Sequence, residues 1–179
     1  VSYGDLHSGN RSRGHRFMAP DEFSITGVKD YIEKARQHHV IVDIAARRQL
    51  IEEQLQSLAD QLGGRINPDS ELLQEVTFLV ESPQALAGSI EAGFLQLPPE
   101  LLITSMREHQ RYFTLVDEQG TLLPHFITIA NTHAVDPTVV VAGNERVLKA
   151  RLADAMFFWR EDQKAPLEKR LDALKKVVY

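Results

Sequence analysis

The sequence has no cysteine among its 179 residues. Disulfides and cysteine-based zinc sites are therefore excluded. It also lacks a signal-peptide pattern and any apolar run of about 18 residues, the length that a membrane-spanning helix needs. We expect a soluble, cytoplasmic protein without a membrane partner.

The usual motifs of nucleotide and metal chemistry are missing as well. There is no glycine-rich phosphate loop, no GxGxxG and no GxSxG. His38 and His39 are adjacent, so on a helix they point in different directions and make a poor metal pair. We therefore assign no catalytic residue and no metal ligand, and we expect this chain to bind no cofactor.

The charge balance is weakly acidic. The chain has 20 lysines and arginines against 25 aspartates and glutamates, a formal net charge of −5. This argues against a uniformly basic binder of nucleic acid but leaves room for a local basic patch. Hydrophobic residues make up 43% of the sequence, enough for a core, and the length fits one compact domain or one domain with an appendage.

The two ends of the chain point to a longer polypeptide. The first residue is Val1, and Tyr179 ends the chain on the apolar side of the helical pattern LEKRLDALKKVVY. Natural domains rarely end in this way, so we expect an excised piece. Pro166 is expected to begin this last helix, whose apolar face would carry Leu167, Leu171, Leu174 and Val178.

Helical periodicity and capping signals predict the other helices. Asp43 can cap a long helix that Gly63 and Gly64 end. Short apolar runs at Phe23–Thr26 and Val40–Val42 are expected to be strands. The predicted helices cover about 28–38, 44–62, 70–79 and 99–106, the last opened by the Pro98-Pro99 pair.

A β-hairpin at about 111–131 is the strongest local prediction. RYFTLV has the aromatic and β-branched content of a strand, and DEQG (117–120) is a turn signal. The return strand, HFITIAN, alternates between two faces, with Phe126, Thr128 and Ala130 on one and Ile127 and Ile129 on the other.

The order of these elements predicts an α+β fold, with short strands and a β-hairpin packed against several helices and a helical C-terminal end. We divide the chain into a mixed α+β body over residues 1–135 and a helical segment over 136–179. The second part would lead toward a downstream domain that is missing here.

The segment GNERVLKARLADAMFFWRED (143–162) combines an apolar face with internal charges. We expect Gly143-Asn144 to break or kink the helix that begins at Asp136-Pro137. Arg151 and Asp154 are three residues apart and are expected to pair along the helix. The apolar face consists of Leu148, Leu152, Ala155, Met156 and Trp159, which Val147 and Phe158 would extend.

Basic residues concentrate in three places. In HSGNRSRGHRF (7–17), an extended chain would place Arg11, Arg13 and His15 on one face, beside Arg16. Such arginines suit phosphate, whose oxygens they bind in pairs, but charged edge strands are also common. Arg146 and Lys149, one turn before Arg151, could meet phosphate at the start of the third stretch.

The second stretch, MREHQRYF (106–113), sets Arg107 and Arg111 beside Tyr112 and Phe113. Arginines next to aromatic rings can hold a phosphate while a ring stacks on a base. The alternative is a helix-to-strand junction with Phe113 in the core and both arginines exposed.

Four stretches together resemble one family, the beta subunit of bacterial tetrameric glycyl-tRNA synthetase. They are RGHRFMAPDEFSI, LLQEVTFLVESPQALAGSIEAGFLQLPPELLITSMREHQRYFTL, LLPHFITIANT and GNERVLKARLADAMFFWREDQKAPLEKRLDALKKVVY. They occur in order over almost the whole chain, and the helix at 43–64 is the part that carries little of the resemblance. The chain resembles an internal fragment of the N-terminal half of that subunit.

The resemblance implies an α2β2 enzyme that joins glycine to its cognate tRNA(Gly) using ATP with Mg²⁺. In that family the alpha subunit carries the class II catalytic core, and the beta subunit mainly recognises and positions tRNA. Expected partners are the alpha subunit, tRNA(Gly) and the remainder of the beta subunit, and the fragment alone is expected to be inactive.

The same resemblance favours phosphate contacts by the basic stretches. The candidates are Arg11, Arg13, Arg16, Arg107, Arg111, Arg146 and Lys149. The alternative is a structural module that docks the alpha subunit, with tRNA bound elsewhere. An independent hydrolase or editing domain is disfavoured because no convincing nucleophile–base set is present.

Overall fold

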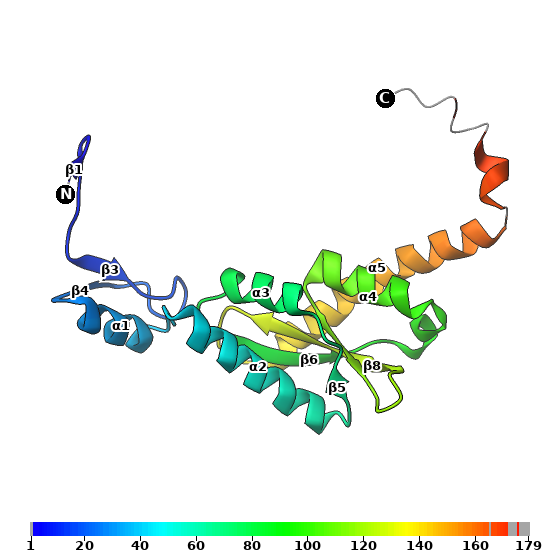
Figure 1. The fold of residues 1–179 in the computed structure, drawn as a ribbon, viewed down its shortest axis with the longest axis horizontal. Helices are drawn as coiled ribbons and strands as arrows, with labels where there is room; N and C mark the ends of the chain where they lie inside the picture. Colours follow the sequence, from blue (N-terminus) through cyan, green and yellow to red (C-terminus); the bar gives the residue numbers. More distant parts are fainter. Residues whose placement is uncertain (1, 165, 172–174, 176–179) are drawn as a thin grey trace.

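A four-stranded antiparallel sheet lies between two sets of helices, with strand order β5–β7–β8–β6 (Figure 1). The computed structural model describes residues 2–164, 166–171 and 175. The α+β class is confirmed.

The strands are β1 (Ser2–Tyr3), β2 (Leu6–His7), β3 (Arg11–Arg13), β4 (Glu22–Ser24), β5 (Arg65–Ile66), β6 (Gln84–Ser89), β7 (Phe113–Val116) and β8 (Leu122–Ala130). The helices are α1 (Val28–Gln37), α2 (Ile44–Gln61), α3 (Ser70–Leu79), α4 (Pro99–Gln110) and α5 (Pro137–Gln163), with 3₁₀ turns η1 (Ala92–Gln96) and η2 (Leu167–Arg170).

Strand β8 divides the core into two hydrophobic clusters, because successive side chains of a strand point to opposite faces of a sheet. Ile127 is fully buried in a cluster with α2 and α3, where it joins Ile51. Phe126 is fully buried in a second cluster with α4 and α5, where it joins Met106 and Leu152. The predicted alternation of this strand is confirmed, and it explains why helices cover both faces.

The predicted hairpin is also confirmed. β7 and β8 pair antiparallel across the turn at 117–120. The Asp117 carboxylate accepts hydrogen bonds from the backbone N–H groups of Gln119 and Thr121, at 3.0 and 2.7 Å. Gly120 has φ 84°, a value that favours glycine. The neighbouring strand β6 was not predicted, because the small residues of QALAGS after Pro83 carry little strand signal.

Three helices begin at an aspartate whose side chain accepts from the first free backbone N–H groups. These are Asp43 before α2, Asp69 before α3 and Asp136 before α5. Such caps satisfy donors that have no partner inside the helix. The predicted capping of the long helix by Asp43 is confirmed, and Gly63, with φ 71°, follows its end.

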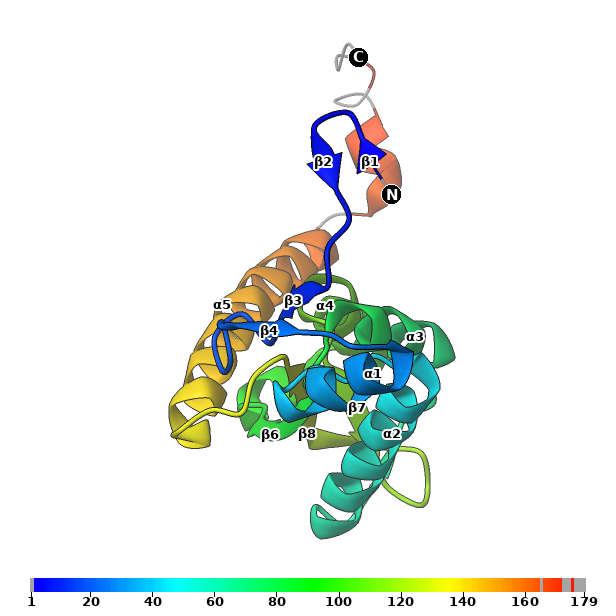
Figure 2. The same cartoon turned by 90° about the vertical axis from the view of Figure 1, so that its left-hand side faces the viewer.

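The N-terminal elements β1–β4 and α1 form a small unit at one end of the sheet, beside the beginning of α2 (Figures 1 and 2). β1 and β2 pair with each other and project away from the rest of the chain. The predicted strand at Val40–Val42 is wrong. Val40 N–H turns back to the carbonyl of Ala35 at 2.8 Å, and Ile41 N–H bonds to the carbonyl of Glu81 at 2.9 Å, so the segment is a link between α1 and α2.

Helix α5 is continuous over 27 residues, so the predicted break at Gly143-Asn144 is wrong. The Asn144 side chain is instead held in place: its amide donates to the carbonyl of Val140 at 2.7 Å, and its oxygen accepts from the Tyr112 hydroxyl at 2.6 Å. Among the helices of the described residues, none has the length and apolar character that crossing a membrane needs.

The buried face of α5 is narrower than predicted. Leu148, Leu152 and Met156 are buried as expected. Val147 and Phe158 are 43% and 63% exposed, so they do not extend this face. At the C-terminal end, η2 lies where the last helix was predicted to begin, and most of that prediction, including Leu174 and Val178, falls outside the described residues.

A glycine substitution tests the continuity of α5. A Cβ added at Gly143 would meet no atom within 4 Å. Glycine inside a helix costs about 0.8–1.0 kcal/mol relative to alanine, so we predict that Gly143→Ala raises the free energy of unfolding in urea by up to that amount. Gly88→Ala serves as a control that should lower the free energy of unfolding, because its Cβ would lie 2.4 Å from the Phe126 ring. A loss of stability in Gly143→Ala would contradict a regular helix at this position.

Candidate nucleic-acid interface

The seven basic residues predicted to contact phosphate lie in three groups. The first is on β3 and the turn that follows it, the second is at the end of α4, and the third is in the middle of α5. Within the described part of the chain, no carboxylate pairs with members of two groups. The structure therefore places these residues at three separate locations.

In the first group, Arg11 and Arg13 share the exposed face of β3, as predicted, and both reach Glu22 on β4. Their nitrogens lie 3.5 and 3.0 Å from its carboxylate. The hydrogen bond and charge of Arg13, with a smaller effect from Arg11, lower the pKa of Glu22. Because two arginines share one carboxylate and all three are exposed, the pairs are weak and this face stays positive.

His15 does not belong to this exposed row, contrary to the prediction. β3 ends at Arg13, the chain then turns, and the His15 ring is only 1% exposed. Its Nε2 lies 2.7 Å from the carbonyl of Asn131, and its Nδ1 accepts from the backbone N–H groups of Phe17 and Met18 at 3.2 and 3.3 Å. A neutral ring with its proton on Nε2 satisfies all three contacts.

The turn of RGHRF is packed too closely for any residue but glycine at its second position. A Cβ on Gly14 would lie 2.5 Å from the Cβ of His38. The backbone N–H of His15 donates to the carbonyl of the same His38 at 2.8 Å. Arg16 and Phe17 thus leave the turn in a fixed direction, with the Arg16 guanidinium carbon 5.5 Å from the centre of the Phe17 ring.

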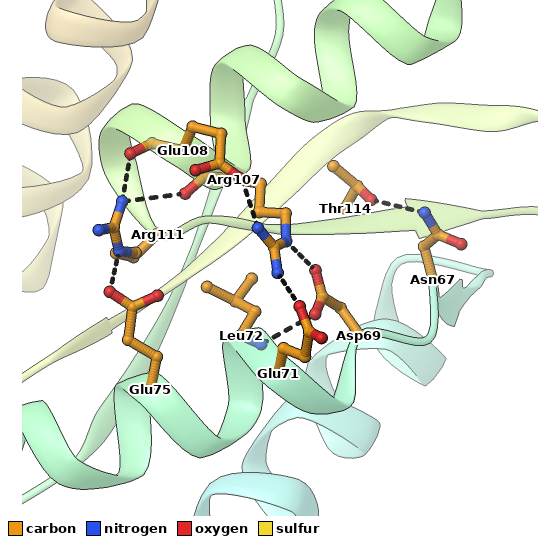
Figure 3. Close-up of polar contacts among 9 residues, drawn as sticks. All are labelled: Asn67, Asp69, Glu71, Leu72, Glu75, Arg107, Glu108, Arg111 and Thr114. Carbon is orange, nitrogen blue, oxygen red and sulfur yellow. Dashed lines mark hydrogen bonds and ion pairs between the residues drawn. The ribbon is translucent and has the colours of Figure 1, made fainter.

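In the second group, Arg107 is surrounded by carboxylates (Figure 3). It donates to Asp69 at 2.6 Å, to Glu71 at 2.9 Å and to Glu108. Its side chain is only 28% exposed, so the alternative prediction of an exposed arginine is wrong here. Its donors are directed to groups of its own chain, an arrangement that joins α4 to the start of α3.

These contacts lower the pKa of the Asp69 carboxyl. Partial burial favours its neutral form, but hydrogen bonds from Arg107 and from the backbone N–H of Leu72 outweigh burial and lower its pKa. The same hydrogen bond, with a further one to Glu108, raises the pKa of Arg107. Asp69 therefore acts both as the cap of α3 and as the ion-pair partner of Arg107.

Arg111 ends α4 in a left-handed conformation, with φ 58°. Its Nε lies 2.5 Å from the carboxylate of Glu75, and its guanidinium also donates to the carbonyl of Glu108 (Figure 3). Phe113, two residues on, is buried in the core as the alternative predicted. The sequence did not indicate Asp69, Glu71 or Glu75 as partners, because they are about 36 residues away along the chain.

In the third group, Arg146 and Lys149 lie on the exposed side of α5 and line an open cavity of about 380 Å³. Lys149 reaches Glu91 at 2.5 Å. Glu145 accepts from the backbone N–H of Ser89 at 2.8 Å, which ties this part of α5 to the end of β6. Arg146 forms no ion pair with any carboxylate of the described residues.

The predicted pair of Arg151 and Asp154 is wrong. Both residues are exposed. They form no ion pair with each other in the part of the chain that the structure describes. Because both side chains are exposed, a pair between them would also have contributed little to the orientation of the helix.

Tyr112, which the sequence suggested only as a stacking ring, helps to fix α5 against the sheet. Its side chain is buried, and its ring stacks on Phe126 with centroids 4.4 Å apart. Its hydroxyl donates to Asn144 on α5 at 2.6 Å, and burial raises its pKa to about 12. Tyr112 is therefore unavailable to stack on a base.

Among the described residues there is also no group of three or more acidic or histidine side chains that could hold a metal.

Comparison with known proteins agrees with the resemblance seen in the motifs. The family model described as glycyl-tRNA synthetase beta subunit matches residues 1–179. The chain belongs to this family. The glycine–tRNA ligase beta subunit of Syntrophotalea carbinolica is 63% identical over 178 residues, and those of Trichlorobacter lovleyi and Geotalea daltonii are 56% and 54% identical over the same length.

Each of these alignments covers 99% of the chain but 26% of the relative. The chain thus spans about a quarter of the length of the curated relatives it matches. The family identification made from RGHRF, MREHQRYF and GNERVLKARLADAMFF is confirmed.

The double role of Asp69 gives a prediction about stability. Asparagine caps helices as well as aspartate does but carries no charge. Alanine is also uncharged and, in addition, cannot cap the helix. We therefore predict that the free energy of unfolding at pH 7 falls in the order wild type, Asp69→Asn, Asp69→Ala, with about 1 kcal/mol between the two variants. Urea denaturation measures this order. Equal stability of the two variants would contradict the cap.

The contribution of the Asp69 charge should also depend on pH. Its pKa in the folded state lies below the ordinary value of 3.8, so the unfolded state binds more protons in this range. The charge of Asp69 therefore stabilises the folded state fully above pH 3.8, the pKa of the unfolded state. This stabilisation is lost as the pH falls through the lower pKa of the folded state. We predict that the stability difference between wild type and Asp69→Asn shrinks as urea unfolding is measured from pH 7 toward pH 3, and a constant difference would contradict the ion pair.

Proposed function

We propose that the chain is part of the beta subunit of a glycine–tRNA ligase and that this part contributes to tRNA binding and to assembly of the subunits. The complete α2β2 enzyme would attach glycine to its cognate tRNA using ATP, and we assign the adenylation chemistry to the alpha subunit. The observation that carries this proposal is the family match over all 179 residues.

The first group of arginines is the best candidate for contact with tRNA. Arg11, Arg13 and Arg16 are exposed, and among the described residues Glu22 is the one carboxylate that forms an ion pair with this group. Arginine binds phosphate through two parallel hydrogen bonds, and phosphate contacts position tRNA without reading its sequence. In the third group, Arg146 and Lys149 remain candidates, since Arg146 is exposed and Lys149 has one exposed partner.

Arg107 and Arg111 are weaker candidates. Their donors are directed to Asp69, Glu71, Glu75 and Glu108, and a phosphate would have to compete with these carboxylates. Moving either guanidinium would also separate α4 from α3. We therefore assign to this pair a structural role rather than a contact with tRNA.

A specific observation favours the second candidate function, the docking of another protein segment. Three large apolar side chains of α5 are exposed to solvent: Val139 (67% exposed), Phe157 (58%) and Phe158 (63%). Protein interfaces are enriched in aromatic residues, whereas isolated surface helices usually show charge on this side. We propose that the part of α5 around Phe157 and Phe158 contacts protein and that the N-terminal unit contacts tRNA.

Salt dependence separates the two roles. In the complete enzyme, we predict that changing Arg11, Arg13 and Arg16 together to alanine weakens tRNA binding and lowers the slope of log K against log salt by about 0.7–0.9 for each phosphate that these arginines no longer neutralise. Fluorescence anisotropy with labelled tRNA measures both quantities. Association with the alpha subunit, measured by co-purification, should be unchanged.

A control with the same loss of charge is available elsewhere on the surface. Arg48, Arg65 and Arg151 are outside the three groups, and changing them to alanine should leave the salt slope as it is. An equal change in both triple variants would mean that net charge alone is responsible. Loss of the alpha subunit from the first variant would assign Arg11, Arg13 and Arg16 to a protein interface.

A further inference from the structure

An open cavity of about 460 Å³ lies between the RGHRF turn and the C-terminal end of α3. Its lining includes Arg16 and Phe17 from the turn, Arg47 from α2, and Phe78 and Leu79 from α3. Cavities of roughly 300–1,000 Å³ are typical of sites for small organic groups. Neither the family match nor the ion pairs of the basic residues give this cavity a role.

Arg47 brings a buried positive charge to this cavity without a counterion. The residue is only 9% exposed, and it forms no ion pair with a carboxylate of the described residues. Its Nε donates to the carbonyl of Thr77 at 2.8 Å and its Nη1 to the carbonyl of Ile41 at 2.6 Å. These bonds fix the guanidinium but do not neutralise it, and a buried charge is costly unless it is paired. An anion in the cavity would supply the missing partner.

The rim of the cavity is aromatic and exposed. Phe17, Phe78 and Leu79 are 75%, 61% and 60% exposed, and none of them belongs to either hydrophobic cluster of the core. Exposed phenylalanine rings beside arginines are the means by which proteins hold single-stranded nucleic acid, with rings stacked on bases and guanidinium groups on phosphates. Arg16, already placed over the Phe17 ring, belongs to both parts of such a site.

The charge around the cavity fits the same ligand. Residues 1–42 contain six lysines and arginines against five aspartates and glutamates, a net charge of +1, whereas residues 43–179 contain 14 against 20, a net charge of −6. The lining contains Arg16, Arg47 and one carboxylate, that of Glu81, which forms an ion pair with neither arginine in the described part of the chain. The cavity thus lies beside the positive end of an acidic chain, where an RNA backbone is least repelled.

We propose that this cavity binds one nucleotide of a single-stranded RNA segment, with its base stacked on Phe17 or Phe78 and its phosphate held by Arg16 and Arg47. The inference rests on the proposed function and specifies where the N-terminal unit would hold an unpaired part of tRNA. It differs from the contacts proposed for Arg11 and Arg13, which lie on the exposed face of β3 and do not line this cavity.

Crosslinking in the complete enzyme tests the proposal directly. p-Benzoylphenylalanine in place of Phe17 should crosslink to tRNA on irradiation. The matched position is Phe158 on α5, which is 63% exposed but does not line the cavity, and it should give no RNA crosslink. A crosslink from position 17 to protein, or none to RNA while the wild-type enzyme binds tRNA, would overturn the nucleotide site and leave the proposed function standing.

Affinity supplies the second readout. Phe17→Ala with Phe78→Ala should weaken tRNA binding about tenfold, since each stacked ring contributes about 1–3 kcal/mol. Val28→Ala with Val135→Ala, two exposed apolar side chains that do not line the cavity, should leave it unchanged. All four side chains are exposed, so folding is not expected to change, and circular dichroism verifies this. Equal affinity of both double variants and wild type would overturn the proposal, whereas a wild-type enzyme that binds no tRNA would remove the proposed function as well.

Discussion

The position of the RGHRF turn depends on the buried imidazole of His15. It joins the RGHRF turn to the carbonyl of Asn131, at the end of β8, while the Asn131 side chain accepts from the backbone N–H groups of Glu81 and Ser82 at 2.8 and 3.0 Å. The turn, the last strand of the hairpin and the segment after α3 are thereby held together. Together with the backbone bond from His15 to His38, this connection fixes Arg16 and Phe17 relative to the sheet.

The basic residues of the chain divide according to the partners they find. Arg107 and Arg111 are enclosed by carboxylates of α3 and α4, and they hold two helices at one edge of the sheet. Arg47 is enclosed as well, but by backbone carbonyls, which orient its charge without cancelling it. The neighbouring acceptor therefore decides whether the charge of an arginine is neutralised within the chain.

Much of the fold follows from local signals. The DEQG turn, the alternation of Phe126 and Ile127, and the Asp43 cap are determined by residues close in sequence, and each was predicted. The contacts that were missed join distant segments: Asp69 with Arg107, Asn144 with Tyr112, and His15 with Asn131. The expected Arg151–Asp154 pair failed because helical spacing brings two side chains near each other but does not determine whether water solvates them instead. Family resemblance identified the family of the chain, whereas the partners of its arginines could be found only from the structure.

A structure of the proposed α2β2 enzyme bound to tRNA is the most direct test of the central proposal, that the RGHRF turn, held in place by His15, forms part of a nucleotide site. We predict an unpaired nucleotide in the cavity, its base against the ring of Phe17 or Phe78 and its phosphate within hydrogen-bonding distance of Arg16 or Arg47. A cavity filled by a segment of the alpha subunit or of the remaining beta subunit, with tRNA elsewhere, would contradict the account.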